Sequence, residues 1–145
     1  MAKKQKQVDM KPKGNEAHWR IMMDQSRQYV GLLSLDGTLM EINRAALELV
    51  GTSAVAVLHR PFWETPWWSH SAALQKQLRA AIRTAAAGEP IRYEATHLAA
   101  DGSLRQVDFS IHPVKDETGR VLFLVPEGND ITEQKRAEAA LKESE

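Results

Sequence analysis

The sequence predicts an α+β domain, in which helices cover one face of a five-stranded antiparallel sheet. Three observations support this prediction. Segments with strand or helix patterns follow the order strand, strand, helices, strand, strand, strand. Asp-Gly pairs at 36–37 and 101–102, and a glycine-containing turn at 116–120, separate neighbouring strands as hairpins require. Apolar and polar residues alternate along part of the strand sequence, which is typical of a sheet with one covered face.

The N-terminal region divides into a leader and a short helix. Residues 1–15 are rich in lysine and contain no aromatic side chain, so we expect a flexible basic leader. Between Glu16 and Ser26, the side chains Trp19, Met22 and Met23 recur at helical spacing. This spacing predicts an amphipathic helix that caps the domain.

A hairpin and a helix follow. Two predicted strands, Tyr29 to Leu35 and Thr38 to Ile42, flank the first Asp-Gly pair. Asn43 is then the expected N-cap of a short helix, and Gly51 is its expected C-terminal stop.

The middle of the chain is rich in tryptophan. Three of the four tryptophans lie between Pro61 and His70, where we expect short helical turns. A longer helix is predicted from Ser71 to Ala87, because Leu74, Leu78 and Ile82 recur every four residues.

Three further strands are predicted in the second half of the chain. Ile91 to Leu98 and Leu104 to Val114 form a hairpin, and the second of them alternates apolar and polar residues. Val121 to Val125 is apolar at every position, which indicates a central strand covered on both faces. Pro126 cannot donate to a ladder, so we expect this strand to end at Val125 or to contain a bulge.

The chain then enters its last helix. Asp130 and, three residues later, Glu133 have the spacing of an acidic capping box. Strong helix formers continue from Thr132 to the end of the sequence, without glycine or proline.

The same helix carries a weak heptad seam. With Gln134 and Leu141 at a positions, Ala137 and Ser144 fall at d. Two interpretations remain open, a helix that pairs with a second copy in a homodimer and a solvated helix without a partner.

These features resemble the PAS sensor domains of bacterial signalling proteins over roughly Glu16 to Glu145. The resemblance implies a sensor domain at 16–130 and a signalling helix of coiled-coil type at 131–145. It also implies that Asp130 to Glu133, which we call the exit motif, relays the signal through a basic side chain, for which Arg105 and Arg120 are candidates. The residues that carry the resemblance are Asn43, Ala46, Leu49 and Gly51 after the first hairpin, and Asp130, Ile131, Thr132 and Glu133 at the exit.

The resemblance further implies a small-molecule pocket between the sheet and the helices. FAD is the leading cofactor if one is bound, and haem, with His70 as its candidate ligand, is the second. An organic acid or an empty, packed interior also remains open, since tryptophans often simply fill a core. By position, the pocket wall would consist of Phe62, Trp63, Trp67, Trp68, His70, Leu74, Tyr93, Phe109 and Ile111.

Other classes of function are excluded or disfavoured. The chain has no cysteine, which excludes disulfides and every cysteine-linked chromophore. It has no phosphate-binding glycine loop and no H-E-x-x-H motif, and its five histidines are scattered, so we expect neither catalysis nor a metal site within this stretch. His97 and His112 lie on predicted strands, where we expect both to face solvent.

Net charge and hydropathy limit the expected partners and cellular location. Basic and acidic residues both number 19, so the net charge gives no case for a nucleic-acid partner. No apolar run approaches the length of a membrane span, and no signal peptide is evident. We therefore expect a cytoplasmic sensory module that signals through its last helix to an output domain, in a histidine kinase or a diguanylate cyclase or phosphodiesterase. The alternatives are a FAD- or haem-binding redox or gas sensor and a ligand-free structural dimerisation domain.

Overall fold

A computed structural model describes residues 16–144, with side chains described from residue 20 onward. The basic leader predicted at residues 1–15 lies outside the described residues. The helices and strands are α1 (Glu16–Gln25), β1 (Tyr29–Leu33), β2 (Leu39–Ile42), α2 (Arg44–Val50), α3 (Ala54–Val57), the 3-10 helix η2 (Phe62–Glu64), α4 (Ala72–Ala86), β3 (Ile91–Leu98), β4 (Leu104–Lys115), β5 (Val121–Asp130) and α5 (Thr132–Ser144).

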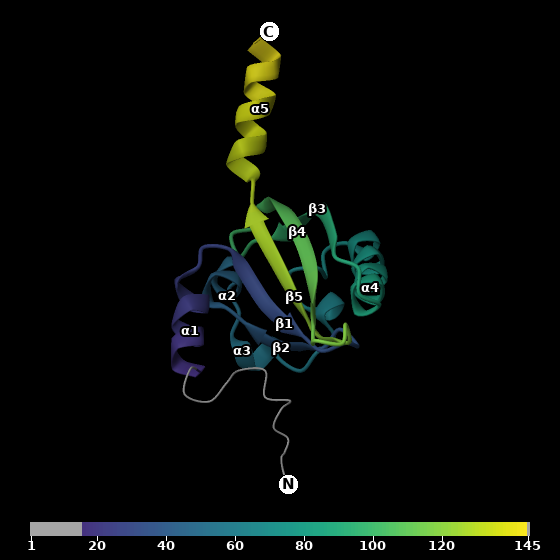
Figure 1. Cartoon of the computed structure of the whole chain (residues 1–145). Helices are drawn as coiled ribbons and strands as arrows, with labels where there is room; N and C mark the ends of the chain where they lie inside the picture. Colours follow the sequence, from purple (N-terminus) through teal and green to yellow (C-terminus); the bar gives the residue numbers. More distant parts are fainter. Residues whose placement is uncertain (1–15, 145) are drawn as a thin grey trace.

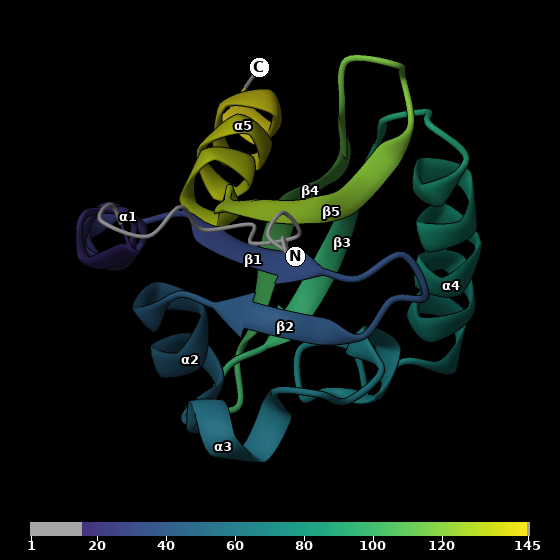
Figure 2. The same cartoon turned by 60° about the horizontal axis from the view of Figure 1, so that its bottom comes forward.

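The five strands form one antiparallel sheet in the order β2-β1-β5-β4-β3. The predicted fold class is confirmed, and β5 is the central strand. Figures 1 and 2 show α2, α3 and α4 gathered on one side of the curved sheet. Helix α5 continues from the end of β5 and points away from the body of the domain (Figure 1).

The first hairpin shows how the glycine turns are built. The Gly37 N–H donates to the Ser34 carbonyl, and the Ser34 N–H donates to the Thr38 carbonyl, both at 3.0 Å. Gly37 has φ 91°, a left-handed conformation that glycine adopts without strain. Leu35 and Asp36 therefore form the corner, and glycine closes the turn behind them. The glycines at 102 and 119 have the same bonding and positive φ in the other two hairpins.

Asn43 ties three elements together. Its side-chain oxygen accepts the Ala46 N–H, which caps α2 as predicted, and also the Val30 N–H of β1. Its amide nitrogen donates to the carbonyls of Met23, in α1, and Gln28. The side chain is fully buried, so these bonds replace the water that it loses on folding.

Two predictions about β5 are wrong. The strand does not end at Val125 but runs through Pro126, which pairs with Ile111 of β4 without a bulge there. No residue of β1 pairs with Pro126 in the described register. The missing N–H of Pro126 therefore interrupts the ladder between β5 and β1 and leaves the ladder between β5 and β4 continuous at this position. The strand is also not fully covered on both faces, because Phe123, Val125 and Glu127, which alternate with the buried Leu124, Pro126 and Gly128, are only half-buried.

Candidate functional site

Five aromatic residues fill the space between the sheet and the helices, and we call them the aromatic interior. Trp68 lies at its centre, with ring centroids 4.8 Å from Phe109 and 5.7 Å from Phe62. Tyr93 packs edge-on against Phe109 at 5.5 Å, and the Trp67 indole N–H donates to the Ala46 carbonyl at 2.9 Å. Edge-to-face packing of this kind stabilises a core beyond its buried area. The members are Phe62, Trp67, Trp68, Tyr93 and Phe109.

Two further rings extend the aromatic interior towards β5. His97 is only 3% exposed, and its ring centroid lies 4.9 Å from that of Trp68 and 6.1 Å from that of Tyr29. Burial lowers the pKa of His97 to about 4, so the ring is neutral near pH 7. Its Nδ1 lies 3.1 Å from the Trp67 carbonyl oxygen, which fixes the proton on Nδ1. The expectation that His97 faces solvent is wrong, whereas His112 is indeed exposed.

The remaining cavity is small. It measures about 20 Å³ and has an apolar wall that includes Tyr29, Phe62, Trp67, His97 and Phe109. That volume suits about one water molecule. The ring systems of FAD and haem are far larger, so neither cofactor fits this arrangement of side chains.

Several residues predicted for a pocket wall lie away from this cavity. Trp63 is half-buried at the edge of the core, and the Arg79 guanidinium lies over its ring, 4.8 Å from the ring centroid. His70 precedes α4, and its Nε2 lies 2.9 Å from the Thr96 hydroxyl, an arrangement that does not suit a haem ligand. Leu74 packs against the rim of the core, and Ile111 is buried within it.

Three buried polar atoms lack a hydrogen-bond partner among the described residues. They are Trp68 Nε1, His70 Nδ1 and the Tyr93 hydroxyl. All three side chains belong to the predicted pocket wall. A buried donor without an acceptor costs free energy, so such atoms point to a bound water or a polar ligand group.

A second set of interactions holds the start of α5, and we call it the exit joint. The Asp130 carboxylate accepts the Arg105 Nε–H at 2.8 Å and the Thr132 N–H at 2.9 Å. The backbone N–H of Gln106 donates to the Thr132 hydroxyl, and the Ile131 N–H donates to the Gln106 carbonyl, both at 2.8 Å. The exit joint therefore consists of Arg105, Gln106, Asp130, Ile131 and Thr132.

The charges of the exit joint favour an ionised Asp130. Partial burial opposes ionisation, but hydrogen bonds from Thr132 and Arg105, together with the charge of Arg105, lower the pKa of the Asp130 carboxyl. Of the two candidate basic partners, Arg105 makes the contact. The predicted capping box is wrong in its other half, since the Glu133 carboxylate pairs with Arg136 at 3.1 Å and Arg105 at 3.9 Å.

Beyond its first turn, α5 is largely solvent-exposed. Lys135 Nζ lies 2.7 Å from the Glu94 carboxylate of β3, a second attachment to the sheet. The predicted seam residues Gln134, Ala137 and Leu141 are all exposed, Leu141 by 66%. The seam is therefore accessible to a partner.

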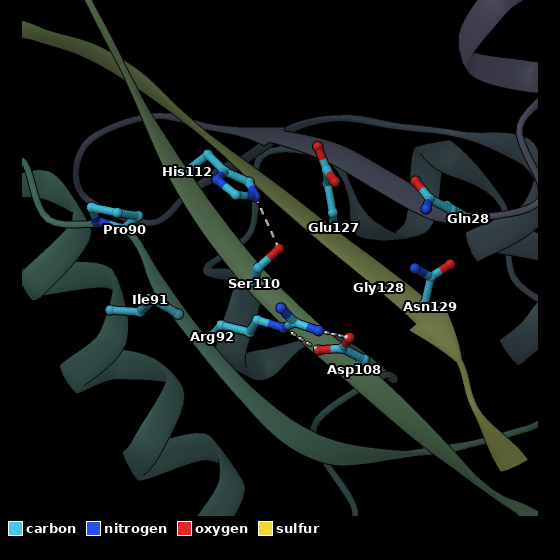
Figure 3. A pocket seen from close by; sticks show the side chains of 10 residues that line it. All are labelled: Gln28, Pro90, Ile91, Arg92, Asp108, Ser110, His112, Glu127, Gly128 and Asn129. Carbon is cyan, nitrogen blue, oxygen red and sulfur yellow. Dashed lines mark hydrogen bonds and ion pairs between the residues drawn. The ribbon is translucent and has the colours of Figure 1, made fainter. Parts of the chain in front are cut away.

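The opposite face of the sheet carries an open groove of about 440 Å³, which the sequence did not suggest (Figure 3). Arg92 and Asp108 form a bidentate pair at 2.9 and 2.7 Å on its floor, and Ser110 bonds to His112 at 3.1 Å. Because these groups satisfy one another, the groove offers few free groups to a ligand.

Strand parity could have revealed the two residues that were missed. His97 shares the inward face of β3 with Tyr93 and Ala95, because alternate residues of a strand point the same way. Tyr29 occupies the inward face of β1 together with Leu33.

Two other features are absent from the described residues, 16–144. No group of three or more histidine or acidic side chains there could hold a metal ion. No helix in that range is long and apolar enough to cross a membrane.

Comparisons with known proteins agree on the fold and on a signalling context. The sequence model of the family described as PAS fold matches residues 23–136. The chain is 38% identical over 127 residues to the sensor histidine kinase TmoS of Ectopseudomonas mendocina, which covers 84% of this chain and 13% of that protein. It is 34% identical over 125 residues to hybrid signal transduction histidine kinase D of Dictyostelium discoideum, covering 85% of this chain and 8% of that protein.

A solved structure gives the same picture of the fold. The PAS domain of Bordetella pertussis BvgS superposes with a TM-score of 0.64 at 24% identity, covering 91% of this chain and 99% of that one. The chain thus spans a small part of the two kinases but nearly all of an isolated sensor domain.

Proposed function

The chain belongs to the PAS fold family, and from this premise we propose that it is a cytoplasmic sensory and dimerisation module. In this proposal it couples a signal to a downstream output domain of the same protein through α5. A histidine kinase is the favoured parent over a diguanylate cyclase or phosphodiesterase, because the two relatives named above are histidine kinases. The module itself carries out no catalysis.

The observation that carries the proposal is the attachment of α5 to the sheet. Asp130 contacts both Arg105 of β4 and the first residue of the helix, Thr132. A movement of β4 against β5 would therefore change the orientation of a helix that has few other contacts. Couplings between sites are typically about 1–3 kcal/mol, and the contacts of one carboxylate can supply a large part of that.

The test is Asp130→Ala in the full-length protein, with output activity measured with and without the stimulus. Regulation should be lost while the melting temperature changes little. Asp116→Ala is a matched control, because Asp116 also accepts backbone N–H groups in an exposed turn but lies at the opposite end of β5. Normal regulation in the Asp130 variant, or equal losses in both variants, would contradict the proposal.

Dimerisation through the exposed seam of α5 can be tested separately. Leu141→Glu should shift the protein from dimer to monomer in sedimentation velocity, since it places charges at an a position. Ala139→Glu alters the same helix away from the seam and should leave the dimer intact. Equal behaviour of the two variants would assign the dimer contact to another surface.

A second candidate function, ligand sensing in the interior, is favoured by the three unpartnered polar atoms. A small ligand with hydrogen-bonding groups could satisfy Trp68 Nε1 and the Tyr93 hydroxyl if the cavity widened. An absorbance spectrum and mass spectrometry of an extract of the purified protein test this. Flavin or haem bands would favour the cofactor-based redox or gas sensor. A colourless small molecule would favour a ligand sensor, and a clean extract would favour a structural dimerisation domain.

A further inference from the structure

We propose that the outward side of α4 is a docking surface for an acidic helix of a partner protein. The surface is a groove of about 530 Å³ between α4 and η2. Three cations of α4 line it, Lys76, Arg79 and Arg83, and we call them the basic stripe. This inference goes beyond the proposed function, because it adds a binding partner at an element other than α5.

The basic stripe lies on the side of α4 that is turned away from the domain. Figures 1 and 2 both show α4 at the periphery, with one side against the body of the domain. Leu78 and Ile82 are buried on that inner side, whereas all three cations of the stripe are exposed. Residues three and four positions apart are neighbours on a helix surface, so positions 76, 79 and 83 form one continuous face. That face is accessible to a partner.

The cations of the basic stripe have no ionic partner among residues 16–144, unlike three cations near β3 and α5. Arg92, Arg105 and Lys135 each have a carboxylate oxygen within 2.8 Å. Glu64 is the single carboxylate that lines the groove, so the cations there outnumber the anions by three to one. The groove therefore carries an excess of positive charge that an acidic partner would neutralise.

Trp63 gives the groove an ordered apolar floor. Its ring fits closely against the first hairpin, since a Cβ at Gly37 would lie 2.8 Å from Trp63 Cζ3. The Gln75 amide donates to the Trp63 carbonyl at 2.8 Å, which fastens η2 to α4, and the Arg79 guanidinium lies over the ring. A surface that is ordered before binding loses less freedom on binding, and tryptophan and arginine are the residues that most often carry binding energy at interfaces.

The shape of the face suits another helix. Two rows of residues at four-residue intervals form it: Ala72, Lys76 and Ala80 in one row, and Gln75, Arg79 and Arg83 in the other. Helices pack through such rows, and the alanines on either side of Lys76 let a partner backbone approach closely. From Lys76 to Arg83 the stripe rises about 10 Å along the helix axis. Carboxylates at three- and four-residue intervals on a partner helix have the same rise, so they can pair with all three cations.

Other occupants match the groove less well. A single small anion would leave part of a stripe of this length unpaired. A nucleic acid usually requires a larger basic surface, and basic and acidic residues are equal in number in this chain. A second copy offers no matching helix among residues 16–144, because the carboxylates of α5, at Glu133, Glu138 and Glu143, are five residues apart and point to different sides.

The experiment is an NMR titration of the complete 145-residue chain with a synthetic alanine-rich peptide whose glutamates recur at i, i+4, i+7 and i+11. The amides from Lys76 to Arg83 and the Trp63 indole N–H should shift, and binding should weaken as salt is added. Removing one exposed ion pair should weaken binding about two- to fivefold. The triple variant Lys76→Gln, Arg79→Gln, Arg83→Gln should therefore bind at least about tenfold more weakly.

Two controls distinguish the groove from unspecific attraction. Arg44→Gln removes an exposed cation from α2 and should leave peptide affinity unchanged. A peptide of the same composition, with its glutamates spread around the helix, should bind clearly more weakly than the one-sided peptide. Absence of shifts in α4, equal affinity of the two peptides, or equal affinity of the triple variant and the wild type would overturn the proposal.

Inorganic pyrophosphate tests the competing occupant. If pyrophosphate shifts the same amides and binds more tightly than the one-sided peptide, the groove is a site for small anions and the proposal is overturned. Weaker binding of pyrophosphate supports the helix. None of these readouts depends on α5, so failure of the proposed function would appear separately, as normal regulation in the Asp130→Ala protein.

Discussion

The aromatic interior is apolar and closely packed, whereas the exit joint is polar and partly exposed to solvent. Trp68 is fully buried and touches rings on three sides, while the side chains of Arg105 and Asp130 remain 24% and 27% exposed. Buried aromatic surface contributes most of the stability of a small domain, whereas a solvent-accessible ion pair contributes little. The comparison indicates that folding depends mainly on the aromatic interior, and under the proposed function transmission to α5 would depend on the exit joint.

The largest expected effect lies in the interior. Trp68→Ala should lower the free energy of unfolding by about 3–5 kcal/mol, because it leaves a large cavity next to Phe109 and His97. Trp63→Ala should cost clearly less, since this side chain is only half-buried and one side of its ring is covered by the Arg79 guanidinium. Urea unfolding followed by circular dichroism measures both. Similar losses of unfolding free energy in the two variants would contradict the greater contribution to stability that we expect of the buried Trp68.

The buried histidine gives the interior a pH dependence. The pKa of His97 is about 4 in the folded protein and near its ordinary value of 6.5 in the unfolded chain, so folding favours the neutral ring. The associated stability is present above about pH 6.5 and is lost as the pH falls towards 4, by up to roughly 3 kcal/mol.

Urea titrations at several pH values test this. His97→Asn should flatten the slope of stability against pH between about 6.5 and 4. His112→Asn changes an exposed histidine on the neighbouring strand and should retain the slope. An equal slope in the wild type and the His97 variant would assign the pH dependence to other groups.

A comparison of two turn glycines with almost the same backbone conformation can distinguish the cost of backbone strain from the cost of a side-chain clash. Gly37 and Gly102 have φ of 91° and 88°. A Cβ at Gly37 would lie 2.8 Å from Trp63 Cζ3 and 3.2 Å from Ile82 Cδ1, whereas a Cβ at Gly102 would have no neighbour within 4 Å. Gly102→Ala should cost about 1–2 kcal/mol through left-handed strain alone. Gly37→Ala should lower the free energy of unfolding by more than this, because the clash adds to the backbone strain. Thermal unfolding of the two variants measures the difference. Equal losses would mean that the neighbouring side chains move aside without cost.

Much of the fold could be predicted from local sequence signals. The three glycine turns, the Asn43 cap and the alternation along β4 depend on residues close together in the chain, and they predicted the sheet and its helices correctly. The end of β5 was predicted wrongly, because the fate of Pro126 depends on pairing with β1, almost a hundred residues earlier in the chain.

The candidate site was less predictable, for a similar reason. The exit motif was found because its residues are consecutive, but the choice of Arg105 over Arg120 depends on the register between β4 and β5. The contacts of His97 and Tyr29 join β1, β3 and the tryptophan segment, and no local pattern specifies such an arrangement. Amino-acid composition also could not show that the aromatic side chains pack against one another and leave only a cavity of about 20 Å³.

We infer that the exit joint can be disturbed without loss of the aromatic interior, and native-state hydrogen exchange of Asp130→Ala tests this claim. The variant should lose about 1 kcal/mol or less of global stability, the usual range for a helix cap. Protection should fall at Ile131, Thr132 and Lys135, while the amides of β4 around Phe109 exchange as in the wild type. Equal losses of protection in α5 and in the sheet would contradict the claim, because Asp130 would then be an ordinary structural cap of the whole domain.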